Sequence, residues 1–171
     1  MPTSDDQGTA SGIAAARRVL AALQALPATL AVAESCTGGL IGHLLTEVPG
    51  ASQTFLGSAV VYANSAKRDL LQVSSELLGD AGAVSEAVVA AMAEGARLLY
   101  DADVAVATSG IAGPGGATPG KAVGTLCLAI SSAGETHART LHLPGLSRGE
   151  FKRAAAQVAL AEVERWAGEH V

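Results

Sequence analysis

The 171-residue sequence has few aromatic residues, few lysines and few cysteines. Phe, Tyr and Trp together make up 3% of the chain, whereas apolar residues make up 49%, and 36 residues are alanine. Side chains this small favour close packing of helices and strands. The length is below the roughly 200 residues at which a second domain is expected, so residues 11–171 are predicted to form a single domain.

The chain also lacks a basic excess, because 11 basic residues face 16 acidic ones and the net charge is -5. Nonspecific nucleic-acid binding needs a basic face that displaces counterions, so no direct nucleic-acid partner is expected. Two cysteines, Cys36 and Cys127, are too few for a disulfide framework and have no metal-ligand spacing. We therefore expect a cytoplasmic protein without a bound metal.

Long apolar runs are absent as well, and none approaches the ~18 residues that a membrane span requires. No membrane association is expected. Residues 1–10 are acidic and polar where a signal peptide is basic and then apolar, and they are expected to form a disordered tail.

Apolar periodicity and turn residues predict alternating helices and strands. Helices are expected over residues 11–26, 39–48, 85–100 and 147–167, with a short helix after residue 63. Strands are expected over 29–33, 54–63 and 103–109, and a hairpin over 123–131 and 136–143. Ser85 is the expected N-cap of the helix over residues 85–100, and Ser147 with Glu150 matches a capping box. This order predicts a three-layer α/β fold with a mixed, mostly parallel sheet flanked by helices.

The segment AESCTGGL places Ser35 where a strand turns into a helix. A helix N-terminus stabilises a developing alkoxide, and the amides that follow Ser35, at Cys36, Thr37, Gly38 and Gly39, can form an oxyanion hole. The alternative is that Ser35 or Thr37 only caps the helix. Cys36 is a rival nucleophile, or else a small buried side chain.

A serine nucleophile needs a base, and the four histidines lie in segments without a Ser-His-Asp context. Lys67, in VVYANSAK, follows a buried strand and can serve if burial lowers its pKa. Moving that pKa from ~10.4 to near 7 requires about 4 to 5 kcal/mol. Tyr62 can relay a proton or hold the lysine. The alternative is an exposed helical lysine beside a core tyrosine.

A glycine-rich loop, GIAGPGGATPGK, follows the third strand and fits no regular element. The amides of Gly113, Gly115 and Gly116 can bind phosphate, with Lys121 supplying charge. The loop matches neither a Walker nor a Rossmann motif, and a purely structural role is equally open. Arg148 and Arg153 in the last helix can reach an anionic ligand, although a solvated helix face is the simpler interpretation.

Taken together, AESCTGGL, GSAVVYANSAK, GAVSE, SGIAGPGG with TP.K.VGT, and the two arginines resemble the CinA C-terminal domain family. The resemblance extends from about residue 12 to residue 166, and its five blocks occur in order. The chain departs from the commoner pattern at Ala117, Gly120 and Ala122, where relatives tend to carry Gly, Glu and Pro. Many relatives have a further N-terminal pyrophosphatase domain, and that activity is expected to be absent here.

The resemblance implies hydrolysis of nicotinamide mononucleotide to nicotinic acid mononucleotide and ammonia, without an organic cofactor. It assigns Ser35 as the nucleophile and Tyr62 and Lys67 as the residues that activate it. It also implies a homo-oligomer. The alternative functions are a noncatalytic pyridine-nucleotide-binding module that acts with protein partners in competence or DNA-damage response, and an amidase for another carboxamide.

Overall fold

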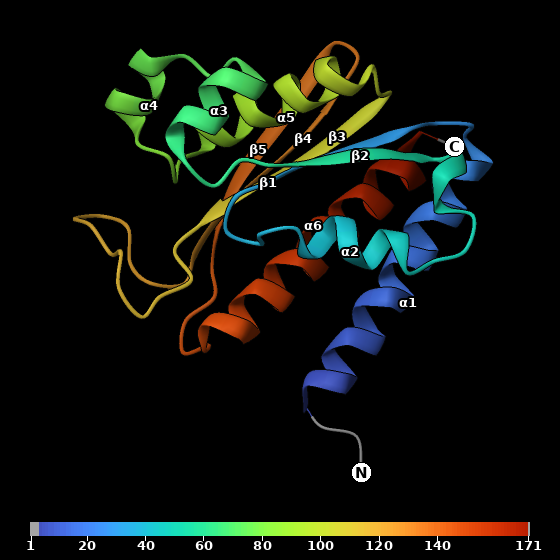
Figure 1. The fold of residues 1–171 in the computed structure, drawn as a ribbon, viewed down its shortest axis with the longest axis horizontal. Helices are drawn as coiled ribbons and strands as arrows, with labels where there is room; N and C mark the ends of the chain where they lie inside the picture. The colour runs from blue at the N-terminus through green and yellow to red at the C-terminus, as the bar shows by residue number, and fades with distance from the viewer. Residues whose placement is uncertain (1–3, 171) are drawn as a thin grey trace.

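A five-stranded sheet lies between two layers of helices in the computed structural model, which describes residues 4–170 (Figure 1). The strand order is β2-β1-β3-β4-β5. The strands are β1 (Leu30–Glu34), β2 (Phe55–Val60), β3 (Val104–Gly110), β4 (Thr125–Ser132) and β5 (Glu135–His142).

The strand directions confirm the predicted mixed, mostly parallel sheet. β1 pairs in parallel with both β2 and β3, whereas β4 is antiparallel to β3 and to β5. Among these five strands, only β4 therefore runs against the others. The carboxyl ends of β1, β2 and β3 meet at one edge of the sheet, which is the usual place for a ligand site in an α/β fold.

The helices cover both faces of the sheet (Figure 1). One layer holds α1 (Ser4–Ala25), α2 (Leu40–Thr46) and α6 (Arg148–Glu169), and the other holds α3 (Asn64–Leu71), α4 (Ser75–Ala81) and α5 (Glu86–Tyr100). Successive residues of β1 serve the two layers in turn, because strand side chains alternate between faces. Leu30 and Val32 pack in the first core, and Ala31 and Ala33 pack in the second.

Two helical segments differ from the prediction. α1 begins at Ser4, so the expected disordered tail is wrong over residues 4–10, while residues 1–3 lie outside the described part of the chain. No proline interrupts the sequence from residue 4 to Ala25, so the helix continues to the N-terminal side of the apolar repeat. α4 was not predicted, because its seven residues are too few to show a periodicity.

Local capping follows the sequence closely. The Ser85 side chain accepts a hydrogen bond from the Val88 amide, and Ser147 and Glu150 form the predicted capping box. Within residues 4–170, no helix combines the length and the apolar character needed to cross a membrane.

Gly95 in α5 provides a test of the close packing between α3 and α5. A Cβ atom at Gly95 would lie 2.2 Å from the carbonyl oxygen of Leu71, whereas a Cβ at Gly79 in α4 would meet nothing within 4 Å. We expect Gly95→Ala to lower the free energy of unfolding by about 2 kcal/mol through overpacking. Gly79→Ala should raise it by up to ~1 kcal/mol, because alanine favours a helix. Urea denaturation measures both, and equal stabilisation by the two variants would contradict the packing argument.

Candidate active site

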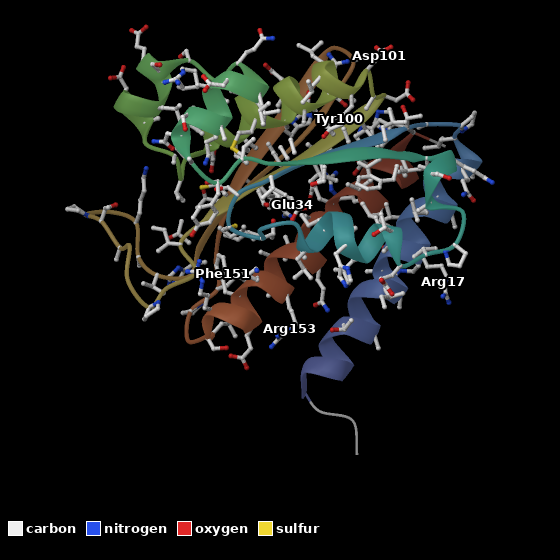
Figure 2. All side chains as sticks on the ribbon, viewed as in Figure 1. Arg17, Glu34, Tyr100, Asp101, Phe151 and Arg153 are labelled. Carbon is white, nitrogen blue, oxygen red and sulfur yellow. The ribbon has the colours of Figure 1, made fainter. Side chains whose placement is uncertain are left out.

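The end of β1 is organised by the buried carboxylate of Glu34 (Figure 2). Its two oxygens accept hydrogen bonds from the amides of Gly39, Ile41 and Gly42, at 2.9, 3.1 and 2.9 Å, and from the Ser58 hydroxyl at 2.8 Å. Four donors satisfy a charge that has no access to water. Sequence reasoning missed Glu34, although a carboxylate directly before a glycine-containing turn and a short helix was visible there.

This arrangement rules out the interpretation in which Ser35 or Thr37 only caps α2. The helix begins at Leu40, and its N-cap is Gly39, which has a φ of 94° and no side chain that could form a capping hydrogen bond. The amides at its start are taken by Glu34 instead. The Thr37 hydroxyl lies 3.0 Å from the hydroxyl of Thr108 on β3.

The side chains of Ser35 and Lys67 meet inside the protein. Lys67 lies in α3 and is 1% exposed, and its Nζ is 3.2 Å from Ser35 Oγ. The same nitrogen is 2.8 Å from the carbonyl oxygen of Val61 and 3.1 Å from that of Tyr62. Burial lowers the pKa of the Lys67 amine below its ordinary value. The alternative of an exposed helical lysine is therefore wrong.

The three oxygens around Lys67 suit both protonation states of the amine. A charged ammonium has three N–H groups and donates to Ser35 Oγ and to both carbonyls. A neutral amine keeps two N–H groups for the carbonyls of Val61 and Tyr62, and its lone pair then accepts the proton of the Ser35 hydroxyl. The same three oxygens therefore hold the Lys67 amine in position in either protonation state.

Cys36 does not compete with Ser35 as a nucleophile. Burial raises the pKa of its thiol to about 12, so the thiolate needed for attack does not form near neutral pH. Its side chain packs in a small cluster with Ala112, Leu126 and Phe151. Of the two interpretations of Cys36, the small buried side chain is the one that the structure supports.

The predicted oxyanion hole is wrong in part. The Gly38 amide donates to the carbonyl oxygen of Ser35 at 3.2 Å, and the Gly39 amide donates to Glu34. Both amides are therefore occupied by the protein itself. Within the described chain, the amides of Cys36 and Thr37 have no backbone carbonyl as acceptor, and they are the better candidates to hold an oxyanion.

Tyr62 contributes to the site in a way that differs from the predicted proton relay. Its backbone carbonyl holds Lys67, whereas its side chain is 63% exposed and its hydroxyl accepts a hydrogen bond from Arg148 at 3.1 Å. Arg148 also donates to the carbonyl oxygen of Gly113 at 3.0 Å. The guanidinium thus joins the end of β2 to the start of the glycine-rich loop.

A cavity of about 110 Å³ opens at this edge of the sheet. Five residues predicted from the sequence line it: Ser35, Cys36, Lys67, Tyr62 and Arg148. Five further lining residues were not predicted as site residues, namely Ala83, Val84, Ser109, Gly110 and Ala112. The first two belong to the GAVSE segment, whose carbonyl at Ala83 accepts a hydrogen bond from Ser109.

Several predicted ligand contacts are not brought to the cavity. Gly115 and Gly116 lie in the exposed part of the loop, together with Ala117, Gly120 and Ala122, where this sequence departs from the commoner pattern. The Lys121 amine donates to the carbonyl oxygen of Ala81 at 2.7 Å, so it ties down the loop.

Arg153 is also directed away from the cavity. Its side chain lies against α1, where a Cβ atom at Gly8 would be 2.9 Å from the Arg153 Cδ (Figure 2). Five residues of helix rotate a side chain by roughly 140° relative to Arg148, so the two arginines cannot share a face.

Residues 13–167 match the model of the CinA C-terminal domain. The chain belongs to the CinA C-terminal domain family. It is 52% identical over 147 residues to a putative competence-damage inducible protein of Symbiobacterium thermophilum, a match that covers 81% of this chain and 34% of that protein. It is 51% identical over 144 residues to a CinA-like protein of Salinibacter ruber, covering 84% and 35%. The chain thus spans about a third of the length of these curated relatives.

Solved structures of the CinA family show the same fold. A competence/damage inducible protein from Agrobacterium tumefaciens has 38% identity and a TM-score of 0.86, covering 89% of this chain and 93% of that one. A CinA superfamily protein from Klebsiella pneumoniae has 32% identity and a TM-score of 0.88, covering 92% and 98%. In the part of the chain described here, no group of three His, Cys, Asp or Glu residues is placed to hold a metal ion.

Glu34→Gln tests the role of the buried carboxylate. We expect it to lower the free energy of unfolding by about 3 kcal/mol, because the amide loses charge-assisted bonds and turns an NH₂ group toward donors. Ser58→Ala removes one of the four donors and should cost only ~1 kcal/mol. Chemical denaturation of both variants measures the difference. An equal, small effect of the two substitutions would show that the carboxylate does not hold the turn.

Proposed function

We propose that this CinA-family protein hydrolyses the carboxamide of nicotinamide mononucleotide to nicotinic acid mononucleotide and ammonia, with Ser35 as the nucleophile. The observation that carries the proposal is the buried contact of 3.2 Å between Lys67 Nζ and Ser35 Oγ. A serine paired with a lysine of lowered pKa is an established arrangement for acyl transfer. The family to which the chain belongs includes enzymes with this activity.

The proposed reaction uses Lys67 first as a base and then as an acid. Neutral Lys67 takes the hydroxyl proton of Ser35 while Oγ attacks the amide carbon, and the amides of Cys36 and Thr37 stabilise the oxyanion. The carbon–nitrogen bond then breaks, and the lysine gives its proton to the leaving nitrogen, which departs as ammonia. Water, deprotonated by Lys67, attacks the acyl-enzyme, and Ser35 regains its proton as the ester bond breaks and the carboxylic acid leaves.

The size of the cavity supports a substrate that enters with its carboxamide first. A volume of about 110 Å³ corresponds to only a few water molecules at ~30 Å³ each, and typical pockets for whole small ligands start near 300 Å³. The cavity therefore suits a carboxamide and part of its ring. The ribose and phosphate of a mononucleotide lie outside it in this proposal, where Arg148 is exposed.

The proposal needs no cofactor, nucleic acid or membrane, and it places the reaction in the cytoplasm. Both cysteines are free and buried, which is consistent with a reducing compartment. The homo-oligomer remains a prediction.

Ser35→Ala tests the proposed nucleophile. Ammonia release from nicotinamide mononucleotide should fall by about 10³-fold or more, because no acyl-enzyme can form. The assay is run with nicotinamide, its riboside and its mononucleotide, and Ser52→Ala, at an exposed serine that does not line the cavity, serves as the control. Wild-type ammonia release by Ser35→Ala would refute the mechanism. Absence of turnover with every substrate would favour the noncatalytic module, and preference for another carboxamide would change the substrate.

Lys67→Met tests the proposed base through the dependence of the rate on pH. Because only the neutral amine accepts a proton, kcat/KM of the wild type should rise with pH and level off above the pKa of Lys67, which burial holds below 10.5. The methionine variant should lose about 10²- to 10⁴-fold in rate and still bind the mononucleotide. A wild-type rate that falls as the pH rises through neutrality would contradict this role, as would an active methionine variant.

A further inference from the structure

The first two turns of α6 present one continuous face to the candidate active site. Arg148, Phe151, Lys152 and Ala155 follow one another at helical spacing, so their side chains share this face. Phe151, which Figure 2 shows on α6, is 1% exposed and fixes the orientation of this face, because it packs with Cys36 and Ala155 in one cluster. The two basic side chains therefore flank an apolar anchor that touches the residue after Ser35.

Lys152 reaches the turn that carries Ser35. Its Nζ lies 3.5 Å from the point that a Cβ atom of Gly38 would occupy. Gly38 has a φ of 60°, and its amide closes the turn by donating to the carbonyl oxygen of Ser35. The ends of such a turn are within about 7 Å of each other at Cα. The ammonium group of Lys152 is thus about one turn of backbone away from the proposed nucleophile.

The charge of Lys152 is not balanced by the protein. It is half-buried, and within residues 4–170 its ammonium group makes no hydrogen bond and has no carboxylate within ion-pair distance. Arg148 lies four residues before it on the same face, and like charges at this spacing destabilise a helix by a few tenths of a kcal/mol. A pair of cations placed together without a protein anion fits an anionic ligand.

We propose that Lys152 and Arg148 form a subsite for the phosphomonoester group of the substrate, outside the cavity that receives the carboxamide. The inference rests on the proposed function, in which the amide carbon lies at Ser35. Arg148 is already held by the Tyr62 hydroxyl and the Gly113 carbonyl, so its remaining N–H groups are oriented in advance. Lys152 adds a second positive charge on the other side of Phe151, and the ribose spans the distance between cavity and subsite.

This subsite explains selectivity for a nucleotide in a chain with a net charge of -5. Two local cations bind a dianion through charge-assisted bonds without a broad basic surface. The glycine-rich loop contributes to this contact only through the Gly113 carbonyl that holds Arg148, and Lys121 takes no part. Arg153, the other basic residue of these turns, faces α1 and takes no part.

The test compares Lys152→Gln with Arg153→Gln, because both remove one positive charge from adjacent positions of α6. Ribose 5-phosphate, which has no amide, is titrated into each protein by calorimetry, and kcat/KM is measured for nicotinamide mononucleotide and its riboside. We expect Lys152→Gln to raise the Kd of ribose 5-phosphate about 10-fold or more. It should lower kcat/KM for the mononucleotide by a similar factor, mainly through KM, and leave the riboside unchanged. Arg153→Gln should alter none of these quantities.

The outcomes separate the subsite from the proposed reaction. If the wild type hydrolyses neither substrate but binds ribose 5-phosphate in a manner that depends on Lys152, the reaction is wrong and the subsite stands. If Lys152→Gln and Arg153→Gln weaken binding equally, general electrostatics explain it and the subsite is wrong. Equal losses for the mononucleotide and the riboside would also overturn it, because Lys152 would then only support the turn. The subsite is also wrong if the wild type fails to bind ribose 5-phosphate and Lys152→Gln hydrolyses the mononucleotide with normal kinetics.

Discussion

A buried lysine amine needs hydrogen-bond acceptors inside the protein, because water cannot reach it. This requirement determines how the residues at the carboxyl ends of β1 and β2 are arranged. Lys67 finds them at the ends of two neighbouring strands, in the Ser35 hydroxyl after β1 and in the carbonyls of Val61 and Tyr62 after β2. On the opposite side of the turn, Glu34 is buried with four donors of its own. Both buried side chains thus find hydrogen-bond partners inside the protein, and Ser35, which directly follows Glu34 in the chain, is one of the partners of Lys67.

The small side chains of the second core make this geometry possible. Ala31 and Ala33 on β1 face the layer that contains α3 and α5, so that layer approaches the sheet closely. Gly95 lets the carbonyl of Leu71, at the end of α3, come directly against α5. The position of α3 determines how far the Lys67 side chain reaches. The high alanine content of the chain therefore has a specific effect. It helps to set the distance between the proposed base, Lys67, and the proposed nucleophile, Ser35.

The sequence predicted those parts of the molecule that depend on local patterns. The alternation of helices and strands, the caps at Ser85 and Ser147 and the proximity of Ser35 to Lys67 followed from periodicity, capping chemistry and the position of strand ends, whereas the order of the strands in the sheet was not predicted. Glu34 was missed because three of its four donors are backbone amides, which no residue type indicates. Arg153 was predicted beside Arg148 because the residue type was weighed and the phase of the helix was not, and its side chain lies against α1 instead. The sequence could not show which amides of the turn remain available for an oxyanion. That depends on the backbone conformation of the turn and on the hydrogen bonds to Glu34, and both require the three-dimensional structure.

The contacts around Ser35 join segments that are far apart in the chain. Thr37 meets Thr108 across 71 residues, and Phe151 from the last helix packs beside Cys36. Parallel strands that are distant in sequence pair slowly, because loop closure must precede the gain from contact. During synthesis the turn leaves the ribosome well before β3 and α6 exist, so the Thr37 hydroxyl then lacks Thr108 and the Cys36 side chain lacks Phe151. The turn that carries Ser35 therefore reaches its final packing only when the last helix of the chain has docked.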